Sequence, residues 1–337
     1  MKTIKIVKKG KPEKLKLEAS PIPIPGENDV LIKVVAAGVN FADILARQGL
    51  YPEAPKVPFI PGYEVAGIIE DTGEKITRFK KGDRVVALTN FGGYAEFVST
   101  PSILVRHLPE DKSFEEAAGL PVNFTTAYHS LYNTGSFTKG NRVLIQAAAG
   151  GVGLAAVQLC KIMECEIFGT ASSIEKITFL KNIGVHHPIN YFTCDFEEEI
   201  LKITKNEKLD IILDSIGGKF IAKELRLLRG HGRIVNLGIA SISGKGKLKI
   251  LIELLKSKRV HPIKLLTSSK GFYGVNIRKI WEFRPDLGKV TFDNIMKLYT
   301  KGKIKPIISR VFSLEEAAKA HSFMENRKNI GKIILKV

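Results

Sequence analysis

The fold of this chain is decided by the stretch RVLIQAAAGGVG, residues 142–153. A β-type segment, residues 142–146, leads into a turn of small residues and then into an apolar segment that predicts a helix ending at Met163. A second β-type segment follows at residues 166–170, so this part of the chain predicts a strand–helix–strand unit. A purely structural contact between small residues is the alternative interpretation of the motif, and the order of strand, turn and helix argues against it.

The glycines of this stretch are typical of a loop that holds a dinucleotide. Gly150 and Gly151 would let a pyrophosphate approach the backbone, and Gly153 would let the helix pack close to the strand. The helix N-terminus would add exposed amides and a partial positive charge. Ala147 stands where the usual G-x-x-G-x-x-G pattern has its first glycine, which weakens the motif slightly. We expect cofactor contacts from Gly150, Gly151, Val152 and Gly153.

The alternation of strands and helices continues along the chain. A helix is predicted from Ser172, because Ser172 and Glu175 have capping-box spacing, to Gly184, which is suited to a left-handed cap. Further strands are expected at 210–214 and 233–238, with a helix between them at 219–228. This alternation predicts an α/β fold with a doubly wound parallel sheet.

The N-terminal part of the chain has a different pattern. Short β-rich pieces separated by glycine and proline predict a compact β domain; they lie at 30–35, 84–88 and 94–98. The C-terminal tail predicts a strand at 304–311, a helix opened by Ser313 with Glu316 three residues on, and a strand at 332–337. No low-complexity linker separates these parts, so we expect domains that pack together.

Composition is ordinary for a globular protein and limits the choice of partners. The 337 residues are enough for two domains, and we expect neither an export signal nor a membrane-spanning segment. Three cysteines without zinc-knuckle spacing favour a reducing compartment, and the predicted location is the cytoplasm. The formal net charge is +18, but the basic residues are scattered, so specific nucleic-acid binding is not expected. Peripheral membrane contact would be compatible with this charge, but it is not predicted.

The end of the second strand indicates which dinucleotide is bound. An acidic residue at this place binds the ribose diol of NAD and repels a 2′-phosphate. Here the chain has Ser172 and Ser173, whose hydroxyls can donate to a phosphate, and Lys176, which can neutralise it. The alternative is that Ser172 only caps a helix and that Lys176 is a solvated surface residue. Because capping and phosphate binding use the same helix start, we predict NADPH as the cofactor, with Ser172 and Lys176 as contacts.

Several spaced motifs resemble one known superfamily. In chain order they are VNFAD (39–43), RQGLY (47–51), PGYE (61–64), GDRV (82–85) and AGGVG (149–153). Together they resemble the medium-chain dehydrogenases/reductases, and within them the zinc-free quinone oxidoreductase branch that includes zeta-crystallin. Three segments resemble the vesicle amine transport protein homologues in particular: AAGGVG (148–153), FGTAS (168–172) and KNIGK (328–332).

This resemblance implies a GroES-like β-barrel catalytic domain and a Rossmann domain. The implied bounds are 1–124 for the catalytic domain, 125–267 for the NADP-binding domain, and 268–337 for a C-terminal segment that returns to the catalytic domain. The resemblance also implies a homodimer. By position, Asn40 and Thr126 would border the nicotinamide, and Tyr191 would stack near the adenosine. The remaining implied cofactor contacts are Leu237, Gly238, Ile239, Gly274 and Asn276.

Whether the chain can bind a catalytic zinc depends on the side chains at the positions of the zinc ligands. Zinc enzymes of the superfamily have a cysteine where this chain has Asn40 and a histidine where it has Tyr63. We therefore expect no metal. Hydride transfer without a metal suits quinones and α,β-unsaturated carbonyls, which accept hydride directly and can take a proton from water. Asn40 and Tyr51 are the expected catalytic residues, as hydrogen-bond partners of the substrate carbonyl. Leu45 departs from the tyrosine common in this branch, which puts substrate contacts there in doubt.

Two functions remain open from the sequence. The first is an NADPH-dependent reductase of quinones or α,β-unsaturated carbonyls. The second is an NADPH-binding protein with little turnover and a regulatory role, or a role in binding vesicles, lipid or nucleic acid. The basic surface and the vesicle-protein resemblance suggest this second function. For Tyr51 the alternative to catalysis is a half-buried packing residue. Turnover of NADPH distinguishes the two functions.

Overall fold

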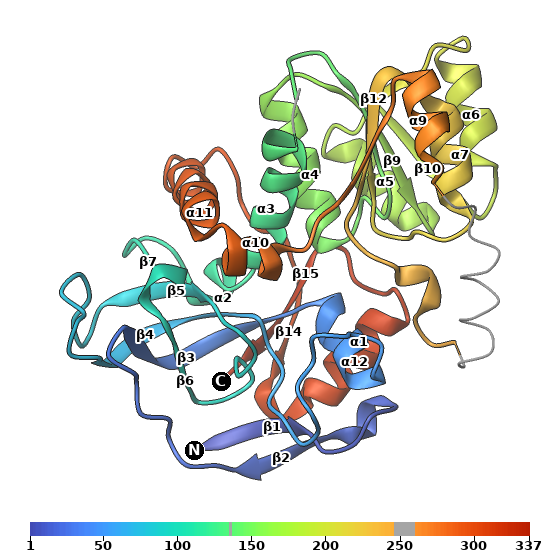
Figure 1. The fold of residues 1–337 in the computed structure, drawn as a ribbon. Coiled ribbons are helices and arrows are strands. Elements are labelled where there is room, and N and C mark those ends of the chain that lie inside the picture. Colours follow the sequence, from blue (N-terminus) through green and yellow to red (C-terminus); the bar gives the residue numbers. More distant parts are fainter. Residues whose placement is uncertain (135–136, 246–259) are drawn as a thin grey trace. The chain divides into compact units, whose positions relative to one another are not determined.

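The computed structural model describes residues 1–134, 137–245 and 260–337. These residues form two compact units, one made of Met1–Thr125 with Arg278–Val337 and the other of Thr126–Ile277 (Figure 1). The first unit thus combines an N-terminal and a C-terminal segment, and the second is the piece of chain between them. Each unit has its own sheet and its own buried core.

The second unit is built on a six-stranded parallel sheet. The strand order is β10-β9-β8-β11-β12-β13, and all neighbours run parallel. The strands are β8 (Arg142–Ile145), β9 (Glu166–Ala171), β10 (His187–Asn190), β11 (Leu209–Asp214), β12 (Leu228–Asn236) and β13 (Gly271–Gly274). The chain builds outward from β8 in one direction and then from β11 in the other. The prediction of a doubly wound parallel sheet is confirmed, and such sheets bind ligands where the strand order reverses.

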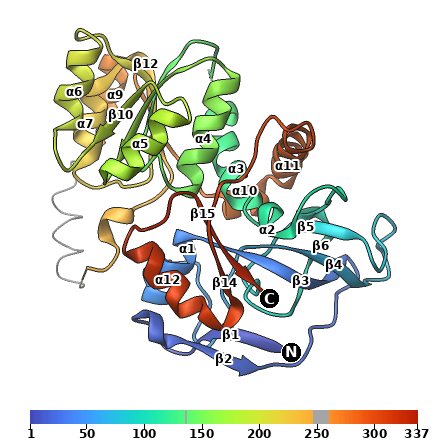
Figure 2. The same ribbon diagram turned by 180° about the vertical axis from the view of Figure 1, so that it is seen from behind.

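Helices cover both faces of this sheet (Figures 1 and 2). On one face, Leu144, Phe168 and Ile212 of neighbouring strands form an apolar row, and Phe196 and Leu227 pack against it from two helices. Burial of this row favours the observed register of the three strands, because a slip by one residue would turn these side chains to the other face. The helices are α4 (Gly151–Ile162), α5 (Ile174–Asn182), α6 (Phe196–Ile203), α7 (Phe220–Leu227) and α9 (Pro262–Ser268), and α3 (Pro121–Tyr128) crosses the boundary between the units.

The start of α5 corrects one prediction. The N-cap is Ser173, whose Oγ accepts a hydrogen bond from the Lys176 amide at 3.3 Å, so the predicted capping box of Ser172 and Glu175 is wrong by one residue. Ser173 has the extended conformation that an N-cap needs, whereas Ser172 directly follows the last residue of β9. Gly184, with φ of +88°, has the left-handed conformation predicted beyond the end of this helix.

The first unit is built on a seven-stranded, mainly antiparallel sheet. The strands follow the order β14-β15-β3-β4-β5-β7, and β6 pairs with β3. They are β3 (Asp29–Val39), β4 (Glu64–Thr72), β5 (Arg84–Leu88), β6 (Phe97–Pro101), β7 (Val105–His107), β14 (Ile308–Ser313) and β15 (Lys332–Lys336). A separate pair consists of β1 (Lys2–Ile6) and β2 (Leu15–Ala19). Because β15 pairs with β3, the C-terminal segment completes the sheet that the N-terminal segment begins.

Two helices that are distant in sequence lie side by side in this unit (Figures 1 and 2). They are α1 (Phe41–Gln48), which follows the long strand β3, and α12 (Ala317–Glu325), which precedes β15. Their contact brings polar residues of both terminal segments into one buried region. The other helices of the unit are α2 (Phe114–Ala117), α10 (Ile277–Phe283), which begins at the boundary, and α11 (Pro285–Thr300).

The strand predicted at 94–98 lies instead at 97–101. The backbone of Tyr94 accepts a hydrogen bond from Ile4 of β1, and Ala95 forms an isolated bridge with Thr3. The Tyr94 side chain is fully buried. These residues therefore join the N-terminal pair of strands to the main sheet rather than extending β6.

The tail follows its predicted pattern with shifted boundaries: β14 ends at Ser313 rather than at 311, and β15 ends at Lys336 rather than at 337. The strand predicted at 304–311 begins only at Ile308, since Pro306 lacks the backbone N–H that a strand ladder needs. Ser313 and Glu316 form the capping box predicted for the following helix. That helix starts with one 3₁₀ turn before it continues as α12.

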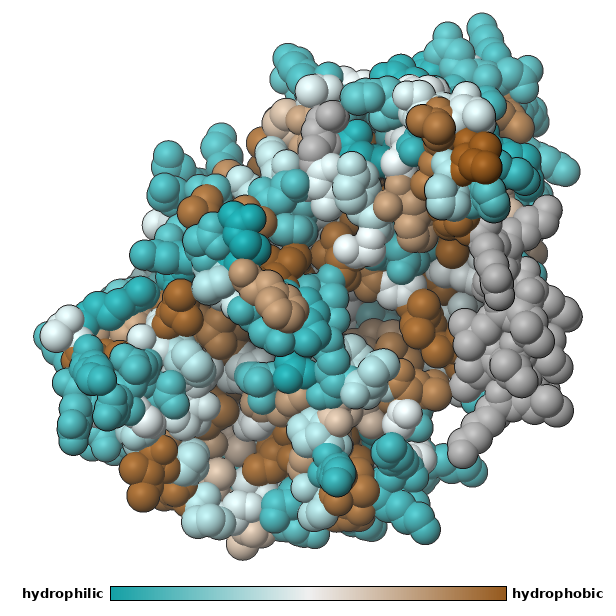
Figure 3. Space-filling model, viewed as in Figure 1, coloured by the Kyte–Doolittle hydropathy of each residue, from teal (hydrophilic) through white to brown (hydrophobic). Residues whose placement is uncertain are grey.

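Hydrophilic residues cover much of the face seen in Figure 3, with hydrophobic ones scattered among them. The two most exposed large apolar side chains in the described part of the chain, Ile24 and Leu266, belong to different units. Among the helices of the described residues, none is long and apolar enough to cross a membrane.

Gly331 controls how β15 enters the sheet. Its φ is +89°, and a Cβ here would lie 2.2 Å from the carbonyl oxygen of Ile307. We expect Gly331→Ala to lower the free energy of unfolding by about 2–4 kcal/mol, because left-handed strain of ~1–2 kcal/mol adds to a backbone clash. Gly302→Ala is the matched control, since its φ is +65° but the space around it is open. Urea unfolding measures both variants, and equal losses would contradict the clash.

Candidate functional site

Most residues predicted to bind the cofactor in the second unit lie at the carboxyl ends of its parallel strands. Gly150, Gly151, Val152 and Gly153 follow β8, Ser172 follows β9, Tyr191 follows β10, Leu237, Gly238 and Ile239 follow β12, and Gly274 and Asn276 lie at or just beyond the end of β13. Thr126 lies on α3 and Lys176 in the first turn of α5. Parallel strands end at one edge of a sheet, so this arrangement puts the residues along the edge that holds the glycine-rich loop.

The glycine-rich loop turns tightly into α4. The Gly150 amide donates to the Ala147 carbonyl oxygen at 2.9 Å, and Gly150 is the N-cap of the helix. A Cβ at Gly153 would lie 2.6 Å from the carbonyl oxygens of both Ala147 and Ala148. Gly153 is therefore needed for the close approach of helix and loop. The first amides of α4 are left without helical partners, as an anion-binding loop requires.

Asp214 organises a second turn at the same edge. Its carboxylate accepts hydrogen bonds from the amides of Ile216 and Gly217, both at 2.8 Å, and from Asn236 Nδ2 at 2.9 Å. Burial raises the pKa of Asp214, and these donors oppose the shift. The turns after β11 and β12 are thereby tied together. The sequence analysis missed Asp214 and Asn236; an aspartate at a strand end followed by Ser-Ile-Gly-Gly is a recognisable turn signal.

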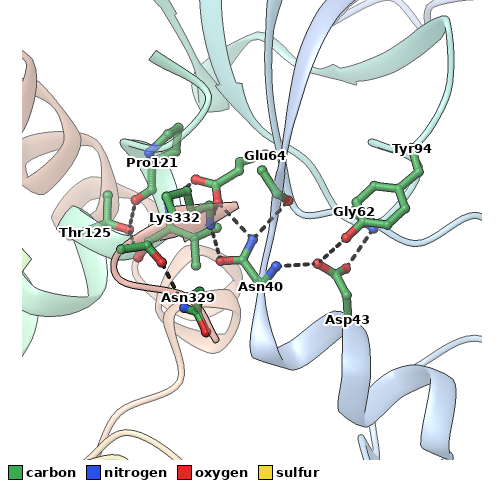
Figure 4. A network of polar contacts seen from close by, with 12 residues as sticks. Asn40, Asp43, Gly62, Glu64, Tyr94, Pro121, Thr125, Asn329 and Lys332 are labelled. Carbon is green, nitrogen blue, oxygen red and sulfur yellow. Dashed lines mark hydrogen bonds and ion pairs between the residues drawn. The ribbon is translucent and has the colours of Figure 1, made fainter. Parts of the chain in front are cut away.

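In the first unit, Asn40 lies in a buried polar network (Figure 4). Lys332 Nζ donates to Asn40 Oδ1 at 2.6 Å and also to Glu64 Oε1. Asn40 Nδ2 donates to Glu64 Oε1 at 2.8 Å, and the Val122 amide donates to Glu64 Oε2 at 2.7 Å. Lysine has no acceptor and carboxylate no donor, so the orientation of the amide is fixed. Asn40 keeps one N–H, whose nearest partner is the Gly38 carbonyl at 3.4 Å.

Asp43 forms the next part of the same network (Figure 4). It is fully buried and accepts hydrogen bonds from the backbone amide of Asn40 at 2.8 Å, the backbone amide of Gly62 at 2.9 Å and the Tyr94 hydroxyl at 3.1 Å. Burial raises the pKa of Asp43 to about 7, although its donors and the Lys332 charge act in the opposite direction. Asp43 thus links the start of α1 to the turn before β4.

A chain of donors leads to Asp43 from α12. Arg47 Nε donates to His321 Nδ1 at 3.3 Å, so the proton of this imidazole is on Nε2, which lies 3.2 Å from the Tyr94 hydroxyl. His321 is fully buried, and burial, with the Arg47 charge, lowers its pKa to about 3, so the imidazole is neutral. Because His321 Nε2 carries the proton, it donates to the Tyr94 hydroxyl, and that hydroxyl in turn donates to Asp43. Arg47 is itself paired with Glu325 at 2.6 Å.

Tyr51 lies in an aromatic group of the first unit. Its ring centroid is 6.0 Å from that of Tyr63, which is 4.9 Å from that of Phe91. Arg278 lies over the Phe91 ring at 5.4 Å and donates to the Glu53 carbonyl at 2.9 Å. Burial, together with the nearby Glu53 carboxylate, raises the pKa of Tyr51 to about 12, so its hydroxyl is a neutral donor. Tyr51 is half-buried, and the packing interpretation of this residue stays open.

Asn40 and Tyr51 are therefore in the same unit, at the two ends of α1. Leu45, on the same helix, is buried. The sequence analysis missed the partners that fix Asn40, namely Glu64, Lys332 and Asp43. A signal was present for Lys332, since it is a lysine directly before the apolar run at 333–335. In the described part of the chain, no cluster of three or more His, Cys, Asp or Glu side chains could hold a metal ion.

The raised pKa of Asp43 makes a pH-dependent contribution to stability. Because the folded-state pKa of about 7 is above the ordinary 3.8, this contribution is fully present below pH ~4 and is lost as the pH rises to about 7. We expect Asp43→Asn to lower the free energy of unfolding by about 1–3 kcal/mol at pH 5, since an amide turns two N–H groups toward these three donors, whereas the protonated carboxyl has a single O–H. The loss should be smaller at pH 8.

Urea unfolding of the natural chain and of Asp43→Asn at the two pH values measures this difference. Asp71→Asn, on an exposed residue of β4, is the control and should show no such trend. A loss that grows between pH 5 and pH 8 would mean that the donors outweigh burial and keep Asp43 ionised throughout.

Two family models match the chain. Residues 26–110 match the alcohol dehydrogenase GroES-like domain, and residues 183–335 match a family described as zinc-binding dehydrogenase. The first match identifies the β domain of the first unit as GroES-like, as the resemblance implied.

Several proteins of known sequence or structure are similar over nearly the whole chain. The human synaptic vesicle membrane protein VAT-1 homolog is 39% identical over 96% of this chain and 83% of its own length. Rat quinone oxidoreductase is 32% identical over 99% of this chain and 97% of its own length. The crystal structure of Escherichia coli quinone oxidoreductase complexed with NADPH is 28% identical, has a TM-score of 0.89, and is matched over 100% of both chains. The chain belongs to the medium-chain dehydrogenase/reductase superfamily and to its quinone oxidoreductase-like branch.

Proposed function

We propose that this protein is a zinc-independent oxidoreductase that transfers hydride from NADPH to quinones or α,β-unsaturated carbonyl compounds. The observation that carries the proposal is the edge of the parallel sheet in the second unit. There the glycine-rich loop, the Ser172–Lys176 segment and the turn held by Asp214 lie at the ends of successive strands. Bound at this edge, NADPH supplies the hydride.

The second unit fits the cofactor in shape and in charge. The missing side chain of Gly153 leaves the loop close to the start of α4, where unpaired amides can bind a pyrophosphate. Ser172 and Ser173 at the end of β9, and half-buried Lys176 one turn later, offer hydroxyls and a positive charge to a 2′-phosphate. Two similar structures, both complexes with NADPH, support the same choice: that of the Escherichia coli quinone oxidoreductase and that of a mycobacterial protein 27% identical to this chain.

The first unit fits a carbonyl acceptor rather than a metal. Asn40 has its side-chain amide fixed by Lys332 and Glu64, so its second N–H, which has only the long 3.4 Å contact with the Gly38 carbonyl, is held in one direction. The ammonium group of Lys332, 2.6 Å from Asn40 Oδ1, would repel a cation at the place where zinc enzymes of the superfamily have a ligand. In our proposal Asn40 and Tyr51 hydrogen-bond the acceptor carbonyl, and water supplies the proton.

Two related proposals concern the state of the protein in the cell. We propose a homodimer in the cytoplasm, on the basis of the superfamily resemblance and of the cysteine content. A role at a membrane is the competing function, and the names of the synaptic vesicle relatives favour it. Enzyme turnover distinguishes the two.

Oxidation of NADPH with a panel of quinones, enones and alkenals tests the reaction directly. We expect turnover that survives exhaustive chelation. We also expect Tyr51→Phe to lower the rate up to about 100-fold with little change in NADPH affinity, because a misplaced acceptor loses rate while the distant cofactor contacts remain. Tyr128→Phe, on α3 of the second unit, is the control for loss of a tyrosine hydroxyl. NADPH binding without oxidation of any acceptor would favour the regulatory or membrane-associated function.

Lys176 tests the choice of cofactor. Loss of one charge-assisted contact to the 2′-phosphate costs about 1.5–3 kcal/mol, so we expect Lys176→Ala to weaken NADPH binding about 10- to 100-fold and to leave NADH binding unchanged. Lys181→Ala, at the other end of α5, controls for loss of a positive charge on the same helix. Fluorescence titration with both cofactors measures the effect. An equal loss of NADH affinity would show that Lys176 acts on the helix rather than on the phosphate.

A further inference from the structure

A buried group of three polar side chains lies beneath the glycine-rich loop and has no part in the proposed reaction. Gln146, Thr170 and Glu224 are each at most 3% exposed. They come from three different elements: Gln146 directly follows β8, Thr170 is in β9, and Glu224 is on α7. Buried polar groups of this kind are expensive to desolvate, so their arrangement requires an explanation.

The three side chains form one continuous chain of hydrogen bonds that ends on the loop. Gln146 Nε2 donates to Glu224 Oε1 at 2.9 Å, and Thr170 Oγ1 donates to Gln146 Oε1 at 2.6 Å. The Ala147 amide in turn donates to Thr170 Oγ1 at 3.2 Å. Because Glu224 is bound by the amide nitrogen of Gln146, the amide oxygen must face Thr170. The Thr170 hydroxyl therefore donates to Gln146 and keeps a lone pair for Ala147.

Ala147 is the residue that needs this support. Its φ is +52°, in the left-handed region that residues with a Cβ rarely occupy. Its N–H is bound by Thr170, and its carbonyl oxygen accepts from the Gly150 amide at 2.9 Å. Strained backbone of this kind persists only where the surroundings determine it fully, and it gathers at functional sites. Ala147 also occupies the position of the first glycine in the usual motif.

We propose that Thr170, Gln146 and Glu224 are positioning residues that hold Ala147 in the left-handed conformation. They would thereby let an alanine open a phosphate-binding loop that otherwise begins with glycine. The proposal rests on the proposed function in one respect, since it takes NADPH as the ligand of this loop. The preorganised amides spare the cofactor the cost of ordering the loop on binding.

Glu224 fits this role in its neutral form. Burial and the nearby Asp214 carboxylate raise the pKa of Glu224 well above its usual range, and Glu224 Oε2 has no hydrogen-bond partner among the described residues. A neutral carboxyl still accepts from Gln146 through Oε1. Glu224→Gln should therefore preserve the chain of hydrogen bonds, whereas Glu224→Leu removes the last acceptor in it.

A double-mutant cycle with residue 147 tests the proposal. We expect Thr170→Val, which removes the hydroxyl but keeps the shape, to weaken NADPH binding about tenfold, or ~1.4 kcal/mol. In an Ala147→Gly background, where the left-handed conformation is no longer strained, we expect the same change to weaken binding less than about threefold. Glu224→Leu should likewise weaken NADPH binding more with alanine than with glycine at position 147. Glu224→Gln should bind NADPH as tightly as the natural chain. If Thr170 had only an ordinary structural role, the loss of NADPH affinity in Thr170→Val would be the same with alanine and with glycine at position 147.

Thr204→Val is the matched control. Thr204 is a buried threonine of the same unit whose hydroxyl donates to the Ile200 carbonyl at 2.8 Å, beyond the end of α6. We expect this variant to bind NADPH equally well with alanine or glycine at position 147. Fluorescence titration measures affinity in all variants. Equal losses for Thr170→Val in both backgrounds would overturn the proposal.

Hydrogen exchange separates this proposal from the choice of cofactor. In the cofactor-free protein, Thr170→Val should speed exchange of the Ala147 amide at least about tenfold and leave the Thr204 amide unchanged. If the natural chain failed to bind NADPH, the proposed function would fail, yet this exchange measurement would still decide whether Thr170 holds Ala147. If Thr170→Val left the exchange rate of the Ala147 amide unchanged, the proposal that Thr170 holds Ala147 would be wrong, whichever ligand the loop binds.

Discussion

The first unit depends on two opposite charges that are buried together. The side chains of Lys332 and Glu64 are 3% and 0% exposed, and their charges are compensated by each other, by Asn40 and by the Val122 amide. Lys332 starts β15, Glu64 starts β4, Asn40 is the N-cap of α1 directly after β3, and Val122 is on α3. Loss of one partner of such a pair typically costs about 3–5 kcal/mol, because the other charge is left uncompensated. The pair therefore ties the C-terminal strand to the N-terminal segment at the position of Asn40.

The same constraint gives the polar side chains their direction. Once Lys332 binds Asn40 Oδ1, the amide can present only an N–H to an acceptor. The Asp43 carboxylate then fixes the Asn40 backbone by accepting a hydrogen bond from its N–H. Tyr94 binds Asp43 and also His321, so the network continues into α12. Catalysis of hydride transfer depends on groups held in place before the substrate binds. In the reaction that we propose, the network would supply that rigidity from residues that do not themselves need to touch the substrate.

Local pattern was enough to predict much of this fold. The apolar strands and the glycines around 142–153 identified the parallel sheet, because the hydrophobic periodicity of a strand or helix can be seen in residues that are neighbours in sequence. Boundaries were less certain: the cap of α5 is Ser173 rather than Ser172, since one residue more of β9 precedes it.

The polar networks could not be read in the same way. Lys332 and Asn40 are 292 positions apart, and no local period connects them. His321 takes its place in a buried hydrogen-bond chain through contacts from α1 and from the segment before β6, which no local pattern around residue 321 indicates. Ala147 is instructive in another way. Its departure from glycine looked like a slight weakness of the motif, whereas the structure keeps the glycine-like conformation and surrounds it with buried partners.

Whether this protein moves a hydride from NADPH to a conjugated acceptor can be decided by following an isotope. NADPH with deuterium at C4 in the pro-R position and NADPH with deuterium in the pro-S position would be incubated separately with the protein and an enone, and each product analysed by mass spectrometry and NMR. We expect deuterium at the β-carbon of the saturated product from one of the two labelled cofactors only, because hydride leaves one face of the nicotinamide. Binding of the labelled cofactors with no deuterium in any product would contradict hydride transfer.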